Sequence, residues 1–465
     1  MFKIPTPEFN TGLGFHYFPD DAHYRAADAQ AWVPKLKALG ASWLTLAGSP
    51  SRAVPEPFVR ALIDAAIEPI IHLAIPPSEP VDLKELEPIY ASYAKWGAHY
   101  VVLYDQPNVR RNWPIDEWAT SGLVGHFVDR LLPALQLART TGLVPVFPPI
   151  KQGGDYWDTA FLDTALNLLK QRGQSQLLKE SVFAFYAFAR NRPPEWGAGG
   201  SARWPQTKPY SVPPGSQDQR GFRSFEWYQE VIRARLGEPR PLLMIAGGAR
   251  MGDADDLDYP AVDETRHTTC NTHIMQAMLN RQLPDYVMNV AFWLLSAPAN
   301  TLDEATAWHK ANGTTLPVVD AMKGQVAEAM QAVAAVEKSV KKTARPAPYS
   351  IPKTPRPKPI FHYILLPTFE WGVSDWHYSA AMEYIHKFKP TCGFSLNEAQ
   401  AAEFVTIIGN EQGVSIDNEQ ALRAAGCKVD RVCGRDGGET QTRLNEMART
   451  GTRFLSWDST DTQCL

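Results

Sequence analysis

The chain has 465 residues, 44% hydrophobic and 21% charged, which is enough for about two or three globular domains. The formal net charge is −4 and no long run of Lys or Arg occurs, which argues against a nucleic-acid partner. No apolar stretch is long enough to span a bilayer and the amino terminus lacks a secretory pattern, so we expect a soluble protein without membrane insertion. The compartment stays open, with the cell surface and the extracellular space among the options.

From residue 14 to about 296, short apolar runs rich in β-forming residues alternate with amphipathic stretches of helical period. The predicted strands cover residues 14–18, 42–48, 68–75, 100–105, 144–150, 181–189, 241–248 and 286–296. Eight strand–helix repeats predict a (β/α)₈ barrel, an α/β fold. The alternative is a doubly wound sheet, but no glycine-rich phosphate loop follows the first strand.

After a polar, Ala-rich helix predicted at 318–342, the chain becomes dense in proline, which forbids helix and favours an extended spacer. We therefore expect a barrel domain at 1–343, a proline-rich linker at 344–359 and a small C-terminal α/β domain at 360–465. The last segment alternates short apolar runs with helical patterns and carries no catalytic constellation of its own.

In a barrel of this kind, functional side chains lie on the loops after the carboxyl ends of the strands. The candidates there are His16, Tyr17, Asp105, Gln106, Asn108, Asp155, Tyr156, Trp157 and Asp158, with Trp196, Trp204 and Asp218 on a long insertion after the sixth strand. Aromatic rings beside carboxylates and amides suit a pyranose, because its C–H face packs on a ring while its hydroxyls take hydrogen bonds. The pattern favours a polysaccharide or oligosaccharide partner, although the tryptophans of the insertion can equally serve only to anchor it.

No cofactor or metal is expected. The acidic run "GDADDLDYPAVDE" (252–264) offers oxygen ligands but lacks the spacing of a calcium-binding loop, which favours a solvated loop. The five cysteines are scattered without zinc spacing, and we expect mostly free thiols.

Three phrases of the barrel carry a resemblance to clan-A glycoside hydrolases: "WVPKLKALGASWLTL", "YAKWGAHYVVLYDQPN" and "PLLMIAGGARMG". In that clan the fourth strand ends in Asn-Glu-Pro, whose Glu is the acid/base, and the seventh ends in a nucleophilic Glu. The matching positions here are Asp105-Gln106-Pro107 and Ala246. The resemblance implies a sugar-binding barrel from which both glutamates are missing.

A retaining glycosidase needs two carboxyl groups about 5 Å apart, and neither Gln106 nor Ala246 can supply one. The first hypothesis is therefore a carbohydrate-binding barrel of glycoside-hydrolase ancestry, a pseudoenzyme. The second is an active hydrolase that uses Asp105 as nucleophile with Asp155, Asp158 or Asp218 as proton donor. The third is a structural subunit of a surface layer or large particle, which predicts a homo-oligomer or larger assembly.

The run "FVTIIGNEQGVSIDNEQALRAAGCKVDRVCGRDGGET" (404–440) resembles the bacterial cell-wall-binding repeat type 2. In that repeat a Val-rich strand ending in Gly is followed by a helix, an Arg-x-x-Gly segment and a Glu-Thr. The resemblance implies attachment to a bacterial surface or polymer. The alternative is a packed α/β appendage without that role.

Overall fold

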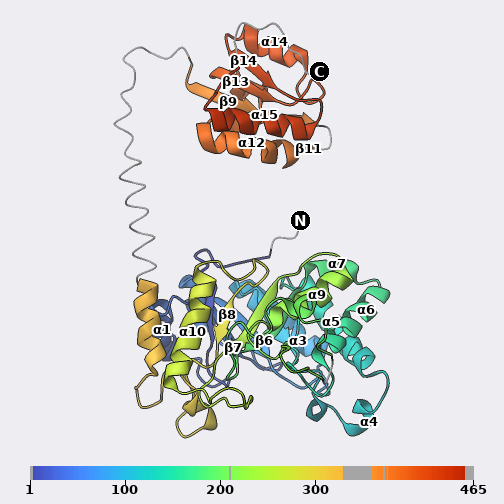
Figure 1. Cartoon of the computed structure of the whole chain (residues 1–465), viewed down its shortest axis with the longest axis vertical. Coiled ribbons are helices and arrows are strands. Elements are labelled where there is room, and N and C mark those ends of the chain that lie inside the picture. Colours follow the sequence, from blue (N-terminus) through green and yellow to red (C-terminus); the bar gives the residue numbers. More distant parts are fainter. Residues whose placement is uncertain (1–3, 209–210, 328–357, 370–371, 374, 456–465) are drawn as a thin grey trace. The chain divides into compact units, whose positions relative to one another are not determined.

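The computed structural model describes residues 4–208, 211–327, 358–369, 372–373 and 375–455 (Figure 1). The chain divides into two compact units, with the division after Lys338. The predicted linker at 344–359 lies almost entirely outside the described residues. Each unit is described by itself below.

The first unit is a parallel barrel. Its strands are β1 (Leu13–His16), β2 (Trp43–Ala47), β3 (Glu68–Leu73), β4 (Tyr100–Leu103), β5 (Val146–Phe147), β6 (Val182–Phe188), β7 (Leu242–Gly248) and β8 (Val290–Phe292). Hydrogen-bonded neighbours follow the order β4-β3-β2-β1-β8-β7-β6-β5, and a parallel bridge between Tyr100 and Val144 joins the two ends. The predicted barrel is confirmed.

Strand β5 is much shorter than the predicted run at 144–150. Pro145, Pro148 and Pro149 flank it, and a proline has no N–H to donate to a neighbouring strand. Regular pairing is therefore limited to Val146 and Phe147, which face Val182 and Phe183 of β6. The chain leaves the sheet early at this point.

Helices surround the strands (Figure 1). They are α1 (Ala26–Ala38), α2 (Glu56–Asp64), α3 (Leu83–Trp96), α4 (Ile115–Trp118), α5 (Leu123–Thr140), α6 (Asp158–Gln171), α7 (Ser175–Glu180), α8 (Gly200–Arg203), α9 (Ser224–Leu236) and α10 (Glu264–Leu279), with short 3₁₀ turns at Arg110–Asn112 and Leu302–Ala305. Residues 317–327 are also helical. Helix α3 ends at Gly97, whose φ of 96° is a left-handed conformation that glycine adopts without a steric penalty.

Two apolar layers hold the barrel together. One fills its interior and includes Trp43, Tyr100 and Ile245, and the other lies between the strands and the helices. Successive residues of a strand point to opposite faces, so the inward positions can be followed along each strand to its carboxyl end. In β3 this parity directs Ile70 and then His72 inward. The same rule fixes which side chains reach the mouth of the barrel.

The second unit is a small parallel α/β domain. Its main strands are β9 (Ile360–Leu365), β12 (Thr391–Gly393), β13 (Ala402–Ile408) and β14 (Lys428–Val432); its helices are α12 (Asp375–Phe388), α13 (Leu396–Ala399), α14 (Ile416–Ala424) and α15 (Gly437–Thr450); and β10 (Thr368–Phe369) pairs with β11 (Gly372–Val373). The strand order is β12-β9-β13-β14, and a hydrophobic cluster covers each face of the sheet. The predicted α/β class is confirmed, whereas the cell-wall-repeat resemblance stays a prediction.

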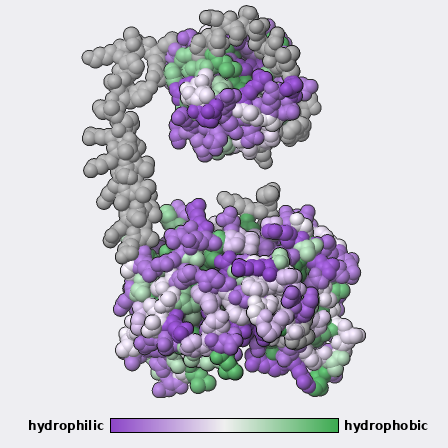
Figure 2. All heavy atoms as spheres, in the orientation of Figure 1, coloured by the Kyte–Doolittle hydropathy of each residue, from purple (hydrophilic) through white to green (hydrophobic). Residues whose placement is uncertain are grey.

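None of the helices within the described residues is long and apolar enough to cross a membrane. On the face of the barrel in Figure 2, hydrophilic side chains predominate and hydrophobic ones form separate small groups. Cys270, Cys392 and Cys427 are free, but Cys433 is disulfide-bonded. Three of the four cysteines among the described residues are therefore free, as expected, and Cys433 is the exception.

Candidate functional site

Side chains from five strand ends gather at the mouth of the barrel. They are His16 at the end of β1, His72 in β3, Asp105 after β4, Tyr186 in β6 and Trp293 after β8. The Tyr186 hydroxyl donates a 2.7 Å hydrogen bond to Asp105 Oδ1, and His72 Nε2 lies 4.0 Å from the same oxygen. The His16 and Trp293 rings are 4.7 Å apart between centroids. These contacts define the mouth site.

Asp105 is the central carboxyl group of the mouth site. Burial raises its pKa, and the opposing effects of His72, the Tyr186 hydrogen bond and Arg111 do not cancel the rise. His72 Nε2 lies 3.2 Å from the Tyr104 carbonyl, which can only accept, so this nitrogen carries the proton. Burial lowers the pKa of His72 and leaves it a neutral neighbour. Asp105 therefore presents an acceptor to the mouth, and Arg111 is the cation that acts on its carboxyl group.

The backbone around Asp105 is strained and firmly held. Tyr104 and Gln106 have φ values of 76° and 45°, left-handed conformations that cost a non-glycine residue about 1 to 3 kcal/mol. The Asn112 amide donates to the carbonyls of Asp105 and Gln106 at 3.2 and 3.0 Å. The Gln106 side chain also interacts with the Tyr186 phenol. These backbone conformations turn the chain so that Asp105 and Gln106 both lie at the mouth, as expected from the sequence for residues at the end of a strand.

Ala246 faces the interior of the barrel. It pairs with Tyr186 across β6 and β7, after a register irregularity between Phe185 and Tyr186. Paired residues of adjacent parallel strands point to the same face, so the Ala246 methyl lies on the same face as the Tyr186 ring. A methyl group at this position cannot act as a nucleophile.

Polar atoms below the mouth keep unused hydrogen-bonding capacity. His16 Nδ1 and Thr45 Oγ1 are buried and have no hydrogen-bond partner among the described residues. The two residues pair across β1 and β2 and so share the inward face. Burial, with a smaller contribution from His72, lowers the pKa of His16 to about 3, so its ring is neutral near pH 7. Buried polar groups are normally paired, so these atoms favour a polar ligand or solvent at the mouth.

Tyr17 lies on the other face of its strand from His16. Its ring packs among Phe18, Tyr24 and Phe58 in the layer between strands and helices. Adjacent strand residues point in opposite directions, so only His16 of this predicted pair faces the mouth.

Asp158 is completely buried at the start of α6. Its two oxygens accept from Gln219 Nε2 at 2.6 Å and from the Tyr228 hydroxyl at 2.8 Å. Burial raises its pKa to about 6 although these hydrogen bonds oppose the rise. Both of its oxygens are thus used between α6 and the elements that follow β6.

The pKa of Asp158 predicts a pH-dependent stability. Because the folded value lies above the unfolded value of 3.8, the stability from this group is complete below about pH 4 and is lost as the pH rises through about 6. The loss amounts to about 3 kcal/mol. Asp158→Asn removes the titrating group, so its unfolding free energy, measured with urea from pH 4 to 7, should fall less with pH than that of the wild type. Parallel curves for the two proteins would contradict this assignment.

Asp218 lies in a buried ion-pair cluster within the insertion after β6. It accepts from the Trp196 indole N–H at 2.9 Å and from Arg192 Nη1 at 3.0 Å, and Arg220 binds its other oxygen. Burial alone would raise its pKa, but Trp196, Arg220 and Arg192 together outweigh burial and lower it. Asp218 is therefore held ionised by its partners, which is unfavourable for a proton donor.

The predicted aromatic residues mostly anchor loops. The Arg192 guanidinium covers the Trp196 ring at 4.2 Å, the Trp204 indole N–H donates to the Ala198 carbonyl at 3.0 Å, and the Tyr156 ring packs edge-on against an aromatic side chain of α6. Trp157 is buried. These rings hold the insertion and the loop after β5 against the barrel, and the aromatic surface of the mouth comes instead from Trp293 and Tyr186.

Asn108 joins the loops after β4 and β5. Its amide donates to the carbonyls of Lys151 and Tyr156 at 2.8 and 2.9 Å and accepts from the Lys151 N–H at 2.9 Å. Asp155, in the same loop, accepts from the Arg110 N–H at 2.9 Å. Asn108 is fully buried, so the structure gives it a positioning contact rather than a surface open to ligand.

Removing the Asn108 amide is expected to destabilise the barrel. Asn108→Ala leaves the three backbone groups without these partners, and the expected cost is about 2 kcal/mol. Chemical denaturation measures the loss, and Asn112→Ala, whose amide is only partly buried, serves as a milder comparison. An unchanged unfolding free energy in Asn108→Ala would show that water replaces the amide.

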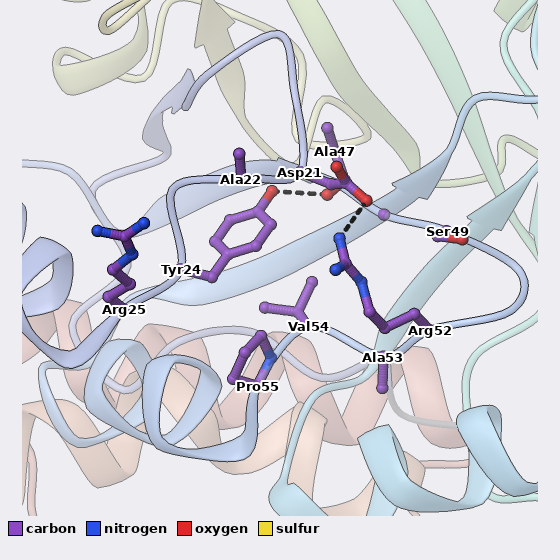
Figure 3. Close-up of a pocket in the computed structure, with 11 residues that line it drawn as sticks. Asp21, Ala22, Tyr24, Arg25, Ala47, Ser49, Arg52, Ala53, Val54 and Pro55 are labelled. Atoms are coloured by element: carbon purple, nitrogen blue, oxygen red, sulfur yellow. Dashed lines mark hydrogen bonds and ion pairs between the residues drawn. The ribbon is translucent and has the colours of Figure 1, made fainter.

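A cavity of about 340 Å³ adjoins the mouth site beside the loops after β1 and β2 (Figure 3). Tyr24 donates to the Ala47 carbonyl at 2.6 Å, and Arg52 pairs with Asp21 at 2.8 Å within it. Ala47 is the register partner of His72, which places the cavity next to the mouth. Within the parts of the chain that the structure describes, no group of three His, Cys, Asp or Glu residues has the arrangement of a metal site.

Neither a protein-family model nor a curated protein sequence matches this chain. Solved structures with a similar barrel include a monomeric β-xylosidase from Caulobacter crescentus, 12% identical with a TM-score of 0.42, where 69% of this chain and 68% of that chain are covered. The GH39 enzyme from Xanthomonas axonopodis pv. citri is 14% identical with a TM-score of 0.43 and coverages of 70% and 67%. Gas2p of Saccharomyces cerevisiae, solved with laminaritriose and laminaritetraose, is 13% identical with a TM-score of 0.37 and coverages of 70% and 68%. The likeness lies in the barrel fold.

Proposed function

We propose that the barrel binds an oligosaccharide at its mouth and does not hydrolyse it by the retaining mechanism. The observation that carries this proposal is the pairing of Ala246 with Tyr186, which sets a methyl group where that mechanism requires a second carboxyl near Asp105. The other candidate carboxyls have internal roles: Asp158 is enclosed between protein donors, and Asp218 is held by two arginines.

The chemistry of the mouth site suits a neutral, hydroxyl-rich ring. Asp105 and Gln106 offer oxygen acceptors and an amide donor to neighbouring sugar hydroxyls. The half-buried Trp293 ring offers a flat apolar surface for the C–H face of the sugar. His16 Nδ1 and Thr45 Oγ1 supply further polar contacts below. Such a combination of one aromatic platform with a few fixed polar groups is typical of saccharide sites.

A hydrolase is the second candidate, because burial raises the pKa of Asp105. A raised pKa is what a carboxyl group needs to donate a proton near neutral pH. In this case Asp155, an exposed residue of the neighbouring loop that accepts from the Arg110 N–H, is the candidate partner. Turnover would then require Asp105, and ligand binding would not.

The test is a panel of neutral plant, fungal and bacterial oligosaccharides, with binding measured by titration calorimetry and products by chromatography on the same samples. We expect heat of binding for at least one oligosaccharide and no products. Products whose formation stops in Asp105→Asn would favour the hydrolase. If no oligosaccharide of the panel gives heat of binding or products, the binding proposal is overturned.

A further inference from the structure

A basic groove lies beside the mouth site, between the loops that follow β4 and β5. Arg110, Arg111 and Lys151 line it together with Asp155 and Ile115, and its volume is about 550 Å³. All three cationic side chains belong to exposed residues. The groove is thus an open surface feature, distinct from the buried contacts of the mouth.

The groove carries an excess of positive charge, since three cationic residues and one acidic residue line it. The described residues contain no ion pair between a carboxylate and Arg110, Arg111 or Lys151, although many other arginines of the barrel are paired. Asp155, the one acidic residue of the lining, accepts from the backbone N–H of Arg110. The whole chain has a formal charge of −4, so this local excess does not reflect a generally basic surface.

One cation of the groove also acts on the carboxyl group of the mouth site. Arg111 is near enough to Asp105 to oppose, together with His72 and Tyr186, the rise that burial causes in the pKa of its carboxyl. Arg111 therefore belongs both to the lining of the groove and to the charged surroundings of Asp105. Ile115, 68% exposed, adds an apolar surface within the groove.

The backbone that carries the three cations is fixed before any ligand binds. Asn108 binds both the N–H and the carbonyl of Lys151. A side chain at Gly154 would place Cβ 2.3 Å from the Asn108 amide nitrogen, so only glycine fits beside the Asn108 side chain. On the other loop, the Trp113 indole N–H donates to the Pro107 carbonyl at 2.8 Å. Such preorganisation lowers the entropy that ligand binding would otherwise cost.

We propose that this groove binds the carboxylate groups of an acidic oligosaccharide, a chain containing uronate residues, whose neighbouring ring occupies the mouth site. The inference rests on the proposed function and names its ligand class. An arginine guanidinium matches a planar carboxylate with two parallel hydrogen bonds, and a lysine adds a point charge. Ile115 packs against the C–H face of the sugar. A nucleic acid fits less well, because its continuous phosphates would also meet Asp105 and a net negative chain.

The experiment titrates the full chain with oligosaccharides of polygalacturonate, alginate and hyaluronan and with their methyl esters, which keep the rings but lose the charge. We expect at least one acid form to bind about tenfold more tightly than its ester, with an affinity that falls as salt is added. Lys151→Gln and Arg110→Gln should each remove most of this preference. Both variants leave Arg111 and His72, the charged and titratable neighbours of Asp105, in place.

Lys84→Gln on α3 and Arg233→Gln on α9 are the matched controls, because both positions are exposed and outside the groove. They should bind as the wild type does. Equal affinity for acid and ester forms in every pair, or an unchanged preference in both groove variants, would overturn the inference while leaving neutral-sugar binding intact. Tighter binding of single-stranded DNA than of any uronate would overturn it in favour of a nucleic acid. Absence of binding by the acid, ester and neutral sugars would overturn the proposed function as well.

Discussion

Replacing Asp218 by Ala is expected to lower the free energy of unfolding of the barrel by about 3 to 5 kcal/mol. The side chain is 1% exposed and accepts from Trp196, Arg192 and Arg220. Its removal leaves Arg192, itself 12% exposed, without one of its two carboxylate partners in a poorly solvated position. The uncompensated charge, rather than the lost attraction, accounts for most of the cost. Urea unfolding followed by circular dichroism measures it.

A surface pair provides the control for Asp218→Ala. Asp129 pairs with Arg172 at 2.7 Å, but the Asp129 side chain is 62% exposed. Asp129→Ala should therefore change the unfolding free energy by less than about 1 kcal/mol, because water screens the pair and solvates the released arginine. Equal losses in the two variants would contradict the account of the Asp218 cluster as a buried anchor of the insertion.

Replacing Asp105 by Asn is expected to weaken oligosaccharide binding by about ten- to a hundredfold. The substitution keeps the shape of the side chain and an oxygen that can still accept from Tyr186, so the fold should persist. A sugar hydroxyl loses a charged acceptor, and hydrogen bonds to charged groups contribute about 1.5 to 3 kcal/mol. Titration calorimetry with the tightest oligosaccharide of the panel measures the change.

Asp64→Asn is the matched control for Asp105→Asn, since Asp64 is exposed at the end of α2 and outside the mouth site. It should leave affinity unchanged. Wild-type affinity in Asp105→Asn would remove Asp105 from the binding site. A stable Asp105→Asn protein that binds normally but loses turnover would instead favour the hydrolase.

The architecture of both units could be predicted from the sequence, because each βα repeat carries two periodicities and a turn that few other structures share. The length of β5 was not predictable from its apolar pattern alone. The pattern continues across Pro145, Pro148 and Pro149, but these residues lack the N–H that strand pairing needs. The α/β fold of the C-terminal domain could be predicted from its alternating strand and helix patterns, whereas its function could not.

The mouth site was only partly predictable. Asp105, Gln106 and His16 end their strands, where polar residues are easily noticed, and the structure brings them to the mouth. His72 and Tyr186 were missed in the sequence analysis. Each lies within a strongly apolar run, and such a run predicts residues of the hydrophobic core. Strand parity was the signal available, since both follow inward-facing positions by two residues.

The contacts of the candidate residues in the loops could not be predicted from the sequence. Trp196 and Asp218 are near each other only because the insertion folds back on itself, and nothing in their spacing encodes that contact. The inward direction of Ala246 depends on a register irregularity that appears only when β6 and β7 pair. Loop conformation and register are set by partners distant in sequence, so such positions cannot be assigned from local patterns.

The central claim is that the mouth site binds a sugar chain without cleaving it. The most direct measurement is a long incubation of the protein with its tightest oligosaccharide in ¹⁸O-labelled water, followed by mass spectrometry of the reducing ends. We predict saturable binding with no labelled fragments above the protein-free control. Labelled fragments that form with the wild type and disappear with Asp105→Asn would contradict the claim and establish a hydrolase.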